Sequence, residues 1–323
     1  MSKSAILLVG GMGTRLHPIT LNIPKPMLPV AGIPFTEHQI VKAREAGIDE
    51  IVLATSFKAE LFEPYFGNGE NFGISIRYAV EETPLGTGGA IRNAAKMLSG
   101  DGLVAIFNGD VLSGHDLEGQ FKFHQEKGAD VSLFLTQVSD ARSFGAVELD
   151  NENRVLAFNE KMENPPTNII NAGCYIFNKE ILYKIPEGKV VSVERETFPN
   201  FLSEGVRVFG FVDNSYWLDI GNPSALLQAT KDLISGKAIS AATPQRTKGA
   251  VILPGAVVDS SAKVINGSVI GANCRVGPRA VIDNSILFDG SEVGADVEIS
   301  SSFVAKDFKI PSGVIGISNF FGF

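Results

Sequence analysis

The chain has 323 residues, enough for two domains, and its content of 44% hydrophobic and 20% charged residues is typical of a globular protein. Its formal net charge of -8 argues against non-specific binding of nucleic acid. Its apolar runs are too short to span a membrane, so we expect no membrane partner. The two cysteines, Cys174 and Cys274, lie far apart without metal-ligand spacing, which fits a reducing compartment and predicts a cytoplasmic protein.

The first 235 residues alternate short apolar runs with amphipathic stretches. The apolar runs predict strands at 5–10, 50–55 and 102–110, and the amphipathic stretches predict helices at 37–47 and 88–98. This order predicts an α/β fold, with a Rossmann-like, mostly parallel sheet covered by helices on both faces. Such sheets bind ligands at the carboxyl ends of their strands, where the glycines at 10–13 and the turn at 108–110 fall.

A different periodicity begins near residue 250. Residues 236–249 are polar and rich in small side chains, which predicts a linker between domains at 1–235 and 250–323. An apolar residue then recurs at every sixth position from Ile252 to Phe288, after which the register slips by one and resumes at Val293. A period of six predicts a left-handed parallel β-helix of hexapeptide repeats, with ordinary strands that happen to fall in step as the alternative.

The predicted β-helix also bears on assembly. A β-helix of about three coils leaves strand edges open at its ends, and such edges need cover. We therefore expect a homo-oligomer, a dimer or larger, with the β-helix contributing to its contacts. The apolar C-terminal residues 317–323 are expected to dock on this or a neighbouring subunit.

A glycine-rich loop follows the first predicted strand, in the stretch LLVGGMGTRLHPITLNIPKPM (7–27). Backbone without Cβ atoms lets N–H groups come close to phosphate oxygens. Arg15 can donate two N–H groups to a phosphate, and Lys25, between two prolines, adds a positive charge in a stiff segment. From these residues alone, a phosphate-binding loop and a turn with an exposed surface cation are about equally favoured.

This stretch resembles the signature of the sugar-1-phosphate nucleotidyltransferases. The resemblance continues in order through EETPLGTGGAI (81–91), FNGDVLSG (107–114), NEK (159–161), NAGCYIF (171–177), VERETFP (193–199) and YWLDIG (216–221). Members of this family transfer a nucleoside monophosphate from a nucleoside triphosphate to a sugar 1-phosphate and release pyrophosphate. Together with the hexapeptide repeats, the motifs most resemble the branch that joins GTP to mannose 1-phosphate.

The resemblance implies roles for the residues of the loop and for two aspartates. The nucleotide would be bound by Leu8, Gly10, Gly11, Gly13 and Thr14. Arg15 would hold the leaving pyrophosphate, and Lys25 would neutralise the reacting phosphates. Asp110 and Asp219 would together bind a divalent cation, Mg²⁺, although each could instead be an ordinary turn or cap residue.

The resemblance also implies a subsite for the sugar 1-phosphate. Lys161 would bind its phosphate, Glu160 and Asn171 its hydroxyls, and Gly145 would let the sugar lie close to the backbone. A solvated ion pair is the alternative for Glu160 and Lys161. The family usually has proline after this lysine, whereas this chain has Met162, so the local loop geometry stays open.

The base and ribose would be bound by Glu82, Pro84, Gly86 and Thr87. A carboxylate only accepts hydrogen bonds, and guanine offers two adjacent donors, N1–H and the 2-amino group. Glu82 therefore predicts GTP as the nucleotide.

Three other functions compete with this one. Hexapeptide β-helices often belong to acyltransferases, but those normally use a histidine base, and all four histidines precede the repeats. A non-catalytic regulatory homologue would be expected to have lost part of the loop, the lysine or the acid pair, and all are present. A glucose-1-phosphate nucleotidyltransferase making ADP-, UDP- or dTDP-glucose remains open, because mannose and glucose differ only at the 2-hydroxyl.

Overall fold

The computed structural model describes residues 2–56 and 58–323, which form two compact units. The first unit comprises the chain up to Gly11 and Gln39–Trp217, and the second comprises Met12–His38 and Leu218–Phe323. The chain therefore passes from one unit to the other after Gly11, within helix α1 (Phe35–Glu45), and after Trp217. The domain limits 1–235, 236–249 and 250–323 stay a prediction from sequence pattern.

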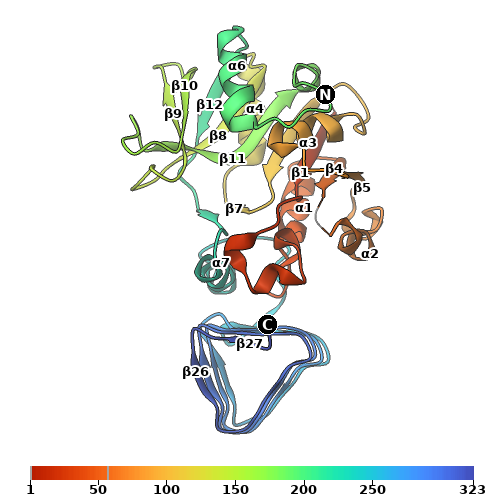
Figure 1. Ribbon diagram of the computed structural model, residues 1–323, viewed down its shortest axis with the longest axis vertical. Coiled ribbons are helices and arrows are strands. Elements are labelled where there is room, and N and C mark those ends of the chain that lie inside the picture. Colours follow the sequence, from red (N-terminus) through yellow and green to blue (C-terminus); the bar gives the residue numbers. More distant parts are fainter. Residues whose placement is uncertain (1, 57) are drawn as a thin grey trace. The chain divides into compact units, whose positions relative to one another are not determined.

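In the described part of the first unit, nine strands form one mixed sheet (Figure 1). Along its main path the order is β10 (Val155–Glu160), β9 (Gly145–Leu149), β11 (Ile169–Asn178), β6 (Leu103–Asn108), β1 (Lys3–Leu8), β4 (Glu50–Thr55) and β5 (Ser75–Val80). Off this path, β8 (Val131–Gln137) pairs with β11, and β12 (Val208–Val212) pairs with β8. Strands β6, β1, β4 and β5 are parallel to one another, as the βαβα pattern predicts, and β11 runs antiparallel to β6.

Helices cover both faces of this sheet. They are α1, α3 (Gly86–Ala95), α4 (Leu117–Glu126), α5 (Lys179–Leu182) and α6 (Phe198–Ser203). The short helix α2 (Glu63–Phe66) and the 3-10 turns Ala59–Leu61 and Glu70–Phe72 belong to the connection between β4 and β5. Ala5, Ile6 and Leu7 on β1 are all fully buried, as expected where both faces of a strand are covered. No helix in the described ranges is long and apolar enough to cross a membrane.

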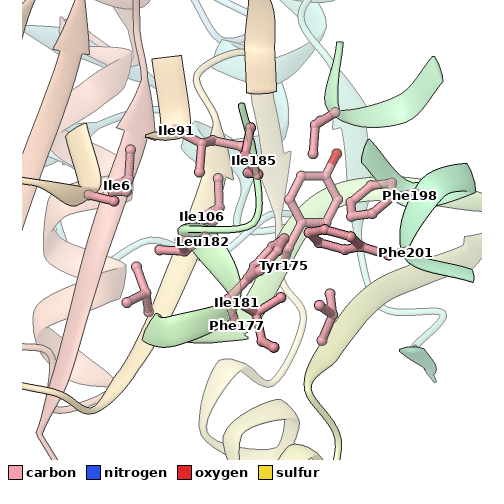
Figure 2. Packing of buried hydrophobic residues seen from close by; sticks show 14 of the residues in the cluster. Ile6, Ile91, Ile106, Tyr175, Phe177, Ile181, Leu182, Ile185, Phe198 and Phe201 are labelled. Atoms are coloured by element: carbon pink, nitrogen blue, oxygen red, sulfur yellow. The ribbon is translucent and has the colours of Figure 1, made fainter. Parts of the chain in front are cut away.

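An aromatic cluster fixes β11 beneath α6 (Figure 2). The rings of Tyr175 and Phe198 meet edge to face with centroids 5.0 Å apart, and Phe177 faces Phe198 from the same strand. A π-helical turn, Val193–Thr197, leads directly into α6. Ile91 of α3 packs against the same core, which thus connects α3, β11 and the π-helical turn.

In the second unit, residues 12–38 are held by the segments that follow residue 218. This stretch contains the 3-10 turns Thr14–Leu16, Ile19–Leu21 and Lys25–Met27 and the hairpin of β2 (Pro29–Val30) and β3 (Ile33–Pro34). The Ala31 N–H donates to Thr230 on α7 (Pro223–Ser235), and Gly32 lies against Val251 and Leu253 of the first β-helix coil. The second unit thus joins the turns that carry Thr14 and Lys25 to the β-helix.

His38 makes a further link inside this unit. Burial lowers its pKa to about 4, so the imidazole is neutral at pH 7. Its Nε2 lies 2.9 Å from the Val30 carbonyl and its Nδ1 2.7 Å from the Ser240 hydroxyl, so Nε2–H donates and Nδ1 accepts.

The C-terminal strands form a parallel β-helix whose coils trace a triangle (Figure 1). Its strands are β15 (Ala250–Ile252), β16 (Val257–Val258), β17 (Lys263–Ile265), β18 (Val269–Ile270), β19 (Arg275–Val276), β20 (Val281–Asp283), β21 (Ile286–Leu287), β22 (Glu292–Val293), β23 (Glu298–Ser300), β24 (Phe303–Val304), β25 (Lys309–Ile310), β26 (Ile315–Ile317) and β27 (Phe320–Phe321). The preceding strand β14 (Arg246–Thr247) pairs antiparallel with β15. Strands from successive coils pair in parallel register on each side of the triangle. The hexapeptide period thus correctly predicted this architecture.

One detail of the predicted repeat is wrong. Ile270 pairs with Leu287, not with Phe288, so the register slips one hexad earlier than the sequence pattern suggests. The cause is a corner that loses one residue: Asn266 and Gly267 precede Ser268 in the first coil, whereas Asn284 alone precedes the equivalent Ser285 in the next.

A column of buried serines stabilises the shortened corner. The Ser268 hydroxyl accepts from the Ser285 N–H at 3.1 Å, and the Ser285 hydroxyl accepts from the Ser302 N–H at 3.0 Å. Phe288, displaced from the stacked column, packs edge-on against Phe323, so the apolar C-terminal residues contact their own β-helix.

Candidate functional site

The loop after β1 begins in the first unit with Gly10, which is closely packed, and Gly11, which is not. The Gly10 carbonyl accepts from the Ser56 hydroxyl at 2.7 Å, and a Cβ on Gly10 would lie only 2.6 Å from that oxygen. A Cβ on Gly11, which is exposed, would meet nothing within 4 Å. Gly10 is therefore needed for packing, whereas the backbone at Gly11 is open to a ligand. Leu8, the last residue of β1, accepts from the Gly109 N–H.

The loop continues in the second unit with a glycine that the packing requires. Gly13 has a left-handed φ of 64°, and a Cβ there would lie 2.8 Å from the Cβ of Lys25. The Thr20 hydroxyl donates to the Gly13 carbonyl at 2.8 Å. A 3-10 turn then begins at Thr14 and leaves Arg15 exposed. The geometry thus brings Gly13 and Lys25 together although twelve positions separate them.

Three charged side chains of the second unit gather beside this loop. Lys25 is only 11% exposed, and its Nζ lies 4.0 Å from Oδ1 of Asp219. A Cβ on Gly221 would lie 3.1 Å from both Arg15 Nη1 and Asp219 Oδ2. Gly221 thus leaves the space in which Arg15 approaches Asp219, a role that the sequence reasoning missed because only the folded chain shows that gap.

Asp110 lies in the first unit, in the turn after β6. Gly109 precedes it, and a Cβ on Gly109 would lie 2.2 Å from the Leu8 carbonyl, so this turn is pressed against the end of β1. Strand β7 (Val111–Ser113) follows at once. No group of three or more histidine, cysteine or acidic side chains that could hold a metal occurs within the described residues. Joint metal binding by Asp110 and Asp219, which belong to different units, therefore stays a prediction.

The residues predicted to bind the sugar 1-phosphate lie on neighbouring strands of the first unit. Gly145 pairs with Glu160 across β9 and β10, and a Cβ on Gly145 would lie 2.8 Å from a Glu160 carboxylate oxygen. Lys161 is 58% exposed, and its Nζ lies 3.6 Å from Glu160. Asn171 on β11 accepts from the Gly173 N–H at 3.1 Å. Gly145, Glu160 and Lys161 thus come together at the paired ends of β9 and β10.

Aromatic side chains flank this group. The indole N–H of Trp217 donates to the carbonyl of Ala172, the neighbour of Asn171, at 3.1 Å. The ring of Phe144, the neighbour of Gly145, meets the indole edge to face with centroids 5.4 Å apart.

Lys161, the residue before Met162, takes a left-handed φ of 50°, which a proline in the next position would disfavour.

The predicted base-binding loop enters α3. Glu82, Pro84 and Gly86 are exposed. Thr87, in the first turn of the helix, donates its hydroxyl to Glu194 at 3.0 Å and accepts from the Val193 N–H at 2.8 Å. The π-helical turn therefore holds the start of α3.

Glu194 also reaches toward the sugar side, which the sequence reasoning missed. Its carboxylate accepts from Tyr175 at the long distance of 3.5 Å, and the Tyr175 hydroxyl accepts from Asn171 Nδ2 at 2.8 Å. A chain of hydrogen bonds thus joins Thr87 to Asn171. The motif VERETFP was visible in the sequence, but nothing in it indicates which acid points inward.

A second acid was also missed. Glu81 is half-buried, one of its carboxylate oxygens accepts from the Leu85 N–H at 3.2 Å, and burial raises its pKa. The other oxygen, Oε1, is buried and has no hydrogen-bond partner among the described residues. A buried acceptor without a donor in such a loop is a candidate ligand contact.

Two family models match the chain in succession. The model described as nucleotidyl transferase matches residues 4–236, and the model described as GlmU-like C-terminal hexapeptide matches residues 237–319.

Known proteins are similar over much of this length. The mannose-1-phosphate guanylyltransferase of Mycobacterium tuberculosis is 47% identical over 292 residues, covering 90% of this chain and 81% of that protein. The D-glycero-alpha-D-manno-heptose 1-phosphate guanylyltransferase of Aneurinibacillus thermoaerophilus is 38% identical, covering 71% of this chain and 97% of that protein. The crystal structure of HddC from Yersinia pseudotuberculosis has a TM-score of 0.60 and 30% identity, covering 71% of this chain and 98% of that one.

Two glycine-to-alanine variants in the loop distinguish an effect on ligand affinity from an effect on the stability of the fold. Gly11→Ala is expected to leave the melting temperature unchanged, because its Cβ meets no atom, yet to weaken pyrophosphate binding about tenfold, because the added methyl group keeps a phosphate oxygen from the backbone N–H. Gly13→Ala is expected to lower the melting temperature as well, because of its left-handed φ and its contact with Lys25. Calorimetric titration and thermal unfolding measure the two effects. Unchanged pyrophosphate binding by Gly11→Ala would remove Gly11 from the anion site.

Proposed function

The chain belongs to the nucleotidyl transferase family, and we propose that it transfers the guanylyl group of GTP to mannose 1-phosphate, giving GDP-mannose and pyrophosphate. The observation that carries this proposal is the 47% identity to a mannose-1-phosphate guanylyltransferase over 90% of the chain. The retained loop glycines, cations and carboxylates support catalysis rather than a purely regulatory role.

In this reaction an oxygen of mannose 1-phosphate forms a bond to the α-phosphorus of GTP, and the bond from that phosphorus to the pyrophosphate oxygen breaks. Negative charge grows on the leaving pyrophosphate, so the chain has mainly to orient the phosphates and neutralise charge. We assign Arg15 to the pyrophosphate and Lys25 to the reacting phosphates. A lysine that is only 11% exposed acts through a medium of lower dielectric than water, which strengthens its attraction for phosphate.

Nucleotidyltransferases of this family usually use a divalent metal, and we propose Mg²⁺. Carboxylate and phosphate oxygens are the ligands that Mg²⁺ prefers, so Asp110 and Asp219 fit this ion. When bound, the cation would neutralise charge on the phosphate oxygens. The Asp219 carboxylate oxygen Oδ1 lies 4.0 Å from the Lys25 ammonium, so an acid for the cation and a base for the phosphates lie side by side.

The sugar 1-phosphate is assigned to the strand ends of the first unit. Lys161, exposed and in a left-handed conformation, contacts the phosphate, and Glu160 and Asn171 contact the hydroxyls. The absence of a side chain at Gly145 leaves room for the Glu160 carboxylate beside the backbone there.

We propose that the enzyme is cytoplasmic, and its two buried free cysteines fit a reducing compartment.

A direct assay tests the proposed reaction. Pyrophosphate release is expected with GTP, mannose 1-phosphate and Mg²⁺ together, and to fall to background when chelator replaces Mg²⁺. Glucose 1-phosphate, and ATP, UTP or dTTP in place of GTP, are expected to give at most about a tenth of the rate, a difference of roughly 1.4 kcal/mol in transition-state binding. A preference for glucose 1-phosphate with another nucleotide would establish the rival activity, and no release from any pair would favour a regulatory protein.

The guanine contact is assigned to the loop 81–87, and two matched variants locate it. Of the adjacent acids, Glu81 is held by the Leu85 N–H and has a buried acceptor oxygen, whereas Glu82 is exposed. We therefore expect Glu81→Gln to lower the ratio of kcat/KM for GTP over ATP by about tenfold, because an amide cannot accept from both guanine donors. Glu82→Gln is the comparison variant. A change in the ratio with Glu82→Gln alone would instead support the assignment made from sequence.

We also propose a homo-oligomer with β-helix contacts. Strands β25, β26 and β27 end the three sheets of the described β-helix, and Ile315 and Ile317 on β26 are 73% and 72% exposed. Light scattering at micromolar concentration is expected to give the mass of at least two chains, and Ile315→Ser with Ile317→Ser is expected to reduce it. A monomeric mass for the parent chain would refute this assembly.

A further inference from the structure

Two side chains of α1 hold the turn that carries Asp110 from both sides. Gln39 and Lys42 are three positions apart and therefore lie on one face of the helix. The Gln39 side-chain amide donates to the carbonyl of Asn108, the last residue of β6, at 2.8 Å. The Lys42 ammonium donates to the carbonyl of Ser113, the last residue of β7, at 2.8 Å. Asp110 lies between these two attachment points.

The Lys42 ammonium makes its contacts away from bulk solvent. Besides the Ser113 carbonyl, it lies 3.3 Å from the Ser113 hydroxyl and 3.1 Å from His115 Nδ1. His115 is buried, stacked on Phe134, and its pKa is far below the usual value, so it is neutral and its Nδ1 accepts. Its Nε2–H then donates to Gln120 at 3.2 Å, which fixes the ring.

Such a lysine weakens the fold. Burial lowers the pKa of Lys42 to about 8, although the carboxylates of Asp213 and Asp116 nearby favour the charged form. Because the folded state disfavours the ammonium relative to the unfolded chain, this side chain reduces stability as the pH falls below the usual lysine pKa of 10.5, and the reduction is complete below about pH 8. A neutral side chain of the same length would be expected to fit this position better unless the ammonium serves another purpose.

We propose that Lys42, together with Gln39, is a positioning residue that fixes the strands on both sides of the Gly109–Asp110 turn and so holds the Asp110 carboxylate in place for the divalent cation. This inference rests on the proposed metal-binding role of Asp110. Gly109 completes the arrangement, because its N–H donates to the Leu8 carbonyl at 3.1 Å and presses the turn against β1. The segment 108–113, which contains Asp110, is thereby attached to β1 at Gly109 and to α1 at Asn108 and Ser113.

The test is the full-length variant Lys42→Met, which keeps the unbranched side chain up to the ε position and removes the charge and the donors. Binding of Mn²⁺ to the enzyme with GTP, in the absence of any sugar phosphate, is followed by water-proton relaxation and does not depend on turnover. We expect roughly tenfold weaker Mn²⁺ binding and a matching rise in the Mg²⁺ concentration for half-maximal rate, as is typical when a group that orients a metal ligand is lost. The KM for mannose 1-phosphate is expected to change less than about twofold, and the melting temperature is expected to fall no further than with Lys179→Met.

Lys179 offers a matched control. It is also buried, and it donates to the carbonyls of Leu98 and Gly100, before the opposite end of β6. Lys179→Met is expected to lower the melting temperature and to leave Mn²⁺ binding unchanged. Lys42→Arg, which keeps the charge and the donors, is expected to recover part of the Mn²⁺ affinity, and Gln39→Leu is expected to weaken it even if Lys42→Met does not fold.

Asp110→Asn separates this inference from the proposed function. If Asp110→Asn weakens Mn²⁺ binding while Lys42→Met and Gln39→Leu do not, Asp110 binds the cation and the positioning role is refuted. If Asp110→Asn has no effect on Mn²⁺ binding, the metal assignment itself fails. An equal loss with Lys179→Met would reduce the effect of Lys42 to general destabilisation and would overturn the inference.

Discussion

The close packing of Gly13 against Lys25 is the contact on which the cationic side of the proposed site depends. With 2.8 Å between a Cβ at Gly13 and that of Lys25, no other residue fits without moving the lysine. The contact keeps Lys25 within 4.0 Å of Asp219, and Gly221 admits Arg15 beside the same carboxylate. A chain with a net charge of -8 can attract a triphosphate only by concentrating cations locally, and glycines provide the room to do so.

The loop glycines are divided between the two compact units. Gly11 ends the first segment of one unit, and Gly13, Arg15 and Lys25 belong to the unit that contains the β-helix. Gly32, farther along the same segment, packs on the first coil, and His38 is hydrogen-bonded to Ser240. The β-helix is therefore part of the support of the phosphate-binding residues as well as a surface for assembly.

Local patterns of apolar residues predicted the strands at 50–55 and 102–110 and the hexapeptide period of the β-helix. The slip at Phe288 was misplaced because a corner can lose a residue wherever hydrogen bonds such as that between Ser268 and Ser285 allow it. The inward orientation of Glu81, rather than Glu82, depends on two contacts. The Leu85 N–H donates to the Glu81 carboxylate, and the Glu81 N–H donates to the Thr55 carbonyl, which continues the pairing of β4 and β5 by one residue. Such contacts join residues that are far apart in the sequence or that point to different sides of the chain. A periodic pattern of apolar residues does not indicate them.

The position of Trp217 has a practical consequence. It is the only tryptophan of the chain, and its indole lies between Phe144 and the backbone of Ala172, next to residues assigned to the sugar 1-phosphate. All intrinsic tryptophan emission of the chain therefore originates from one place, next to the residues to which we assign the acceptor sugar. The protein thus contains its own spectroscopic label, with which occupancy of the acceptor subsite can be followed without modifying the chain.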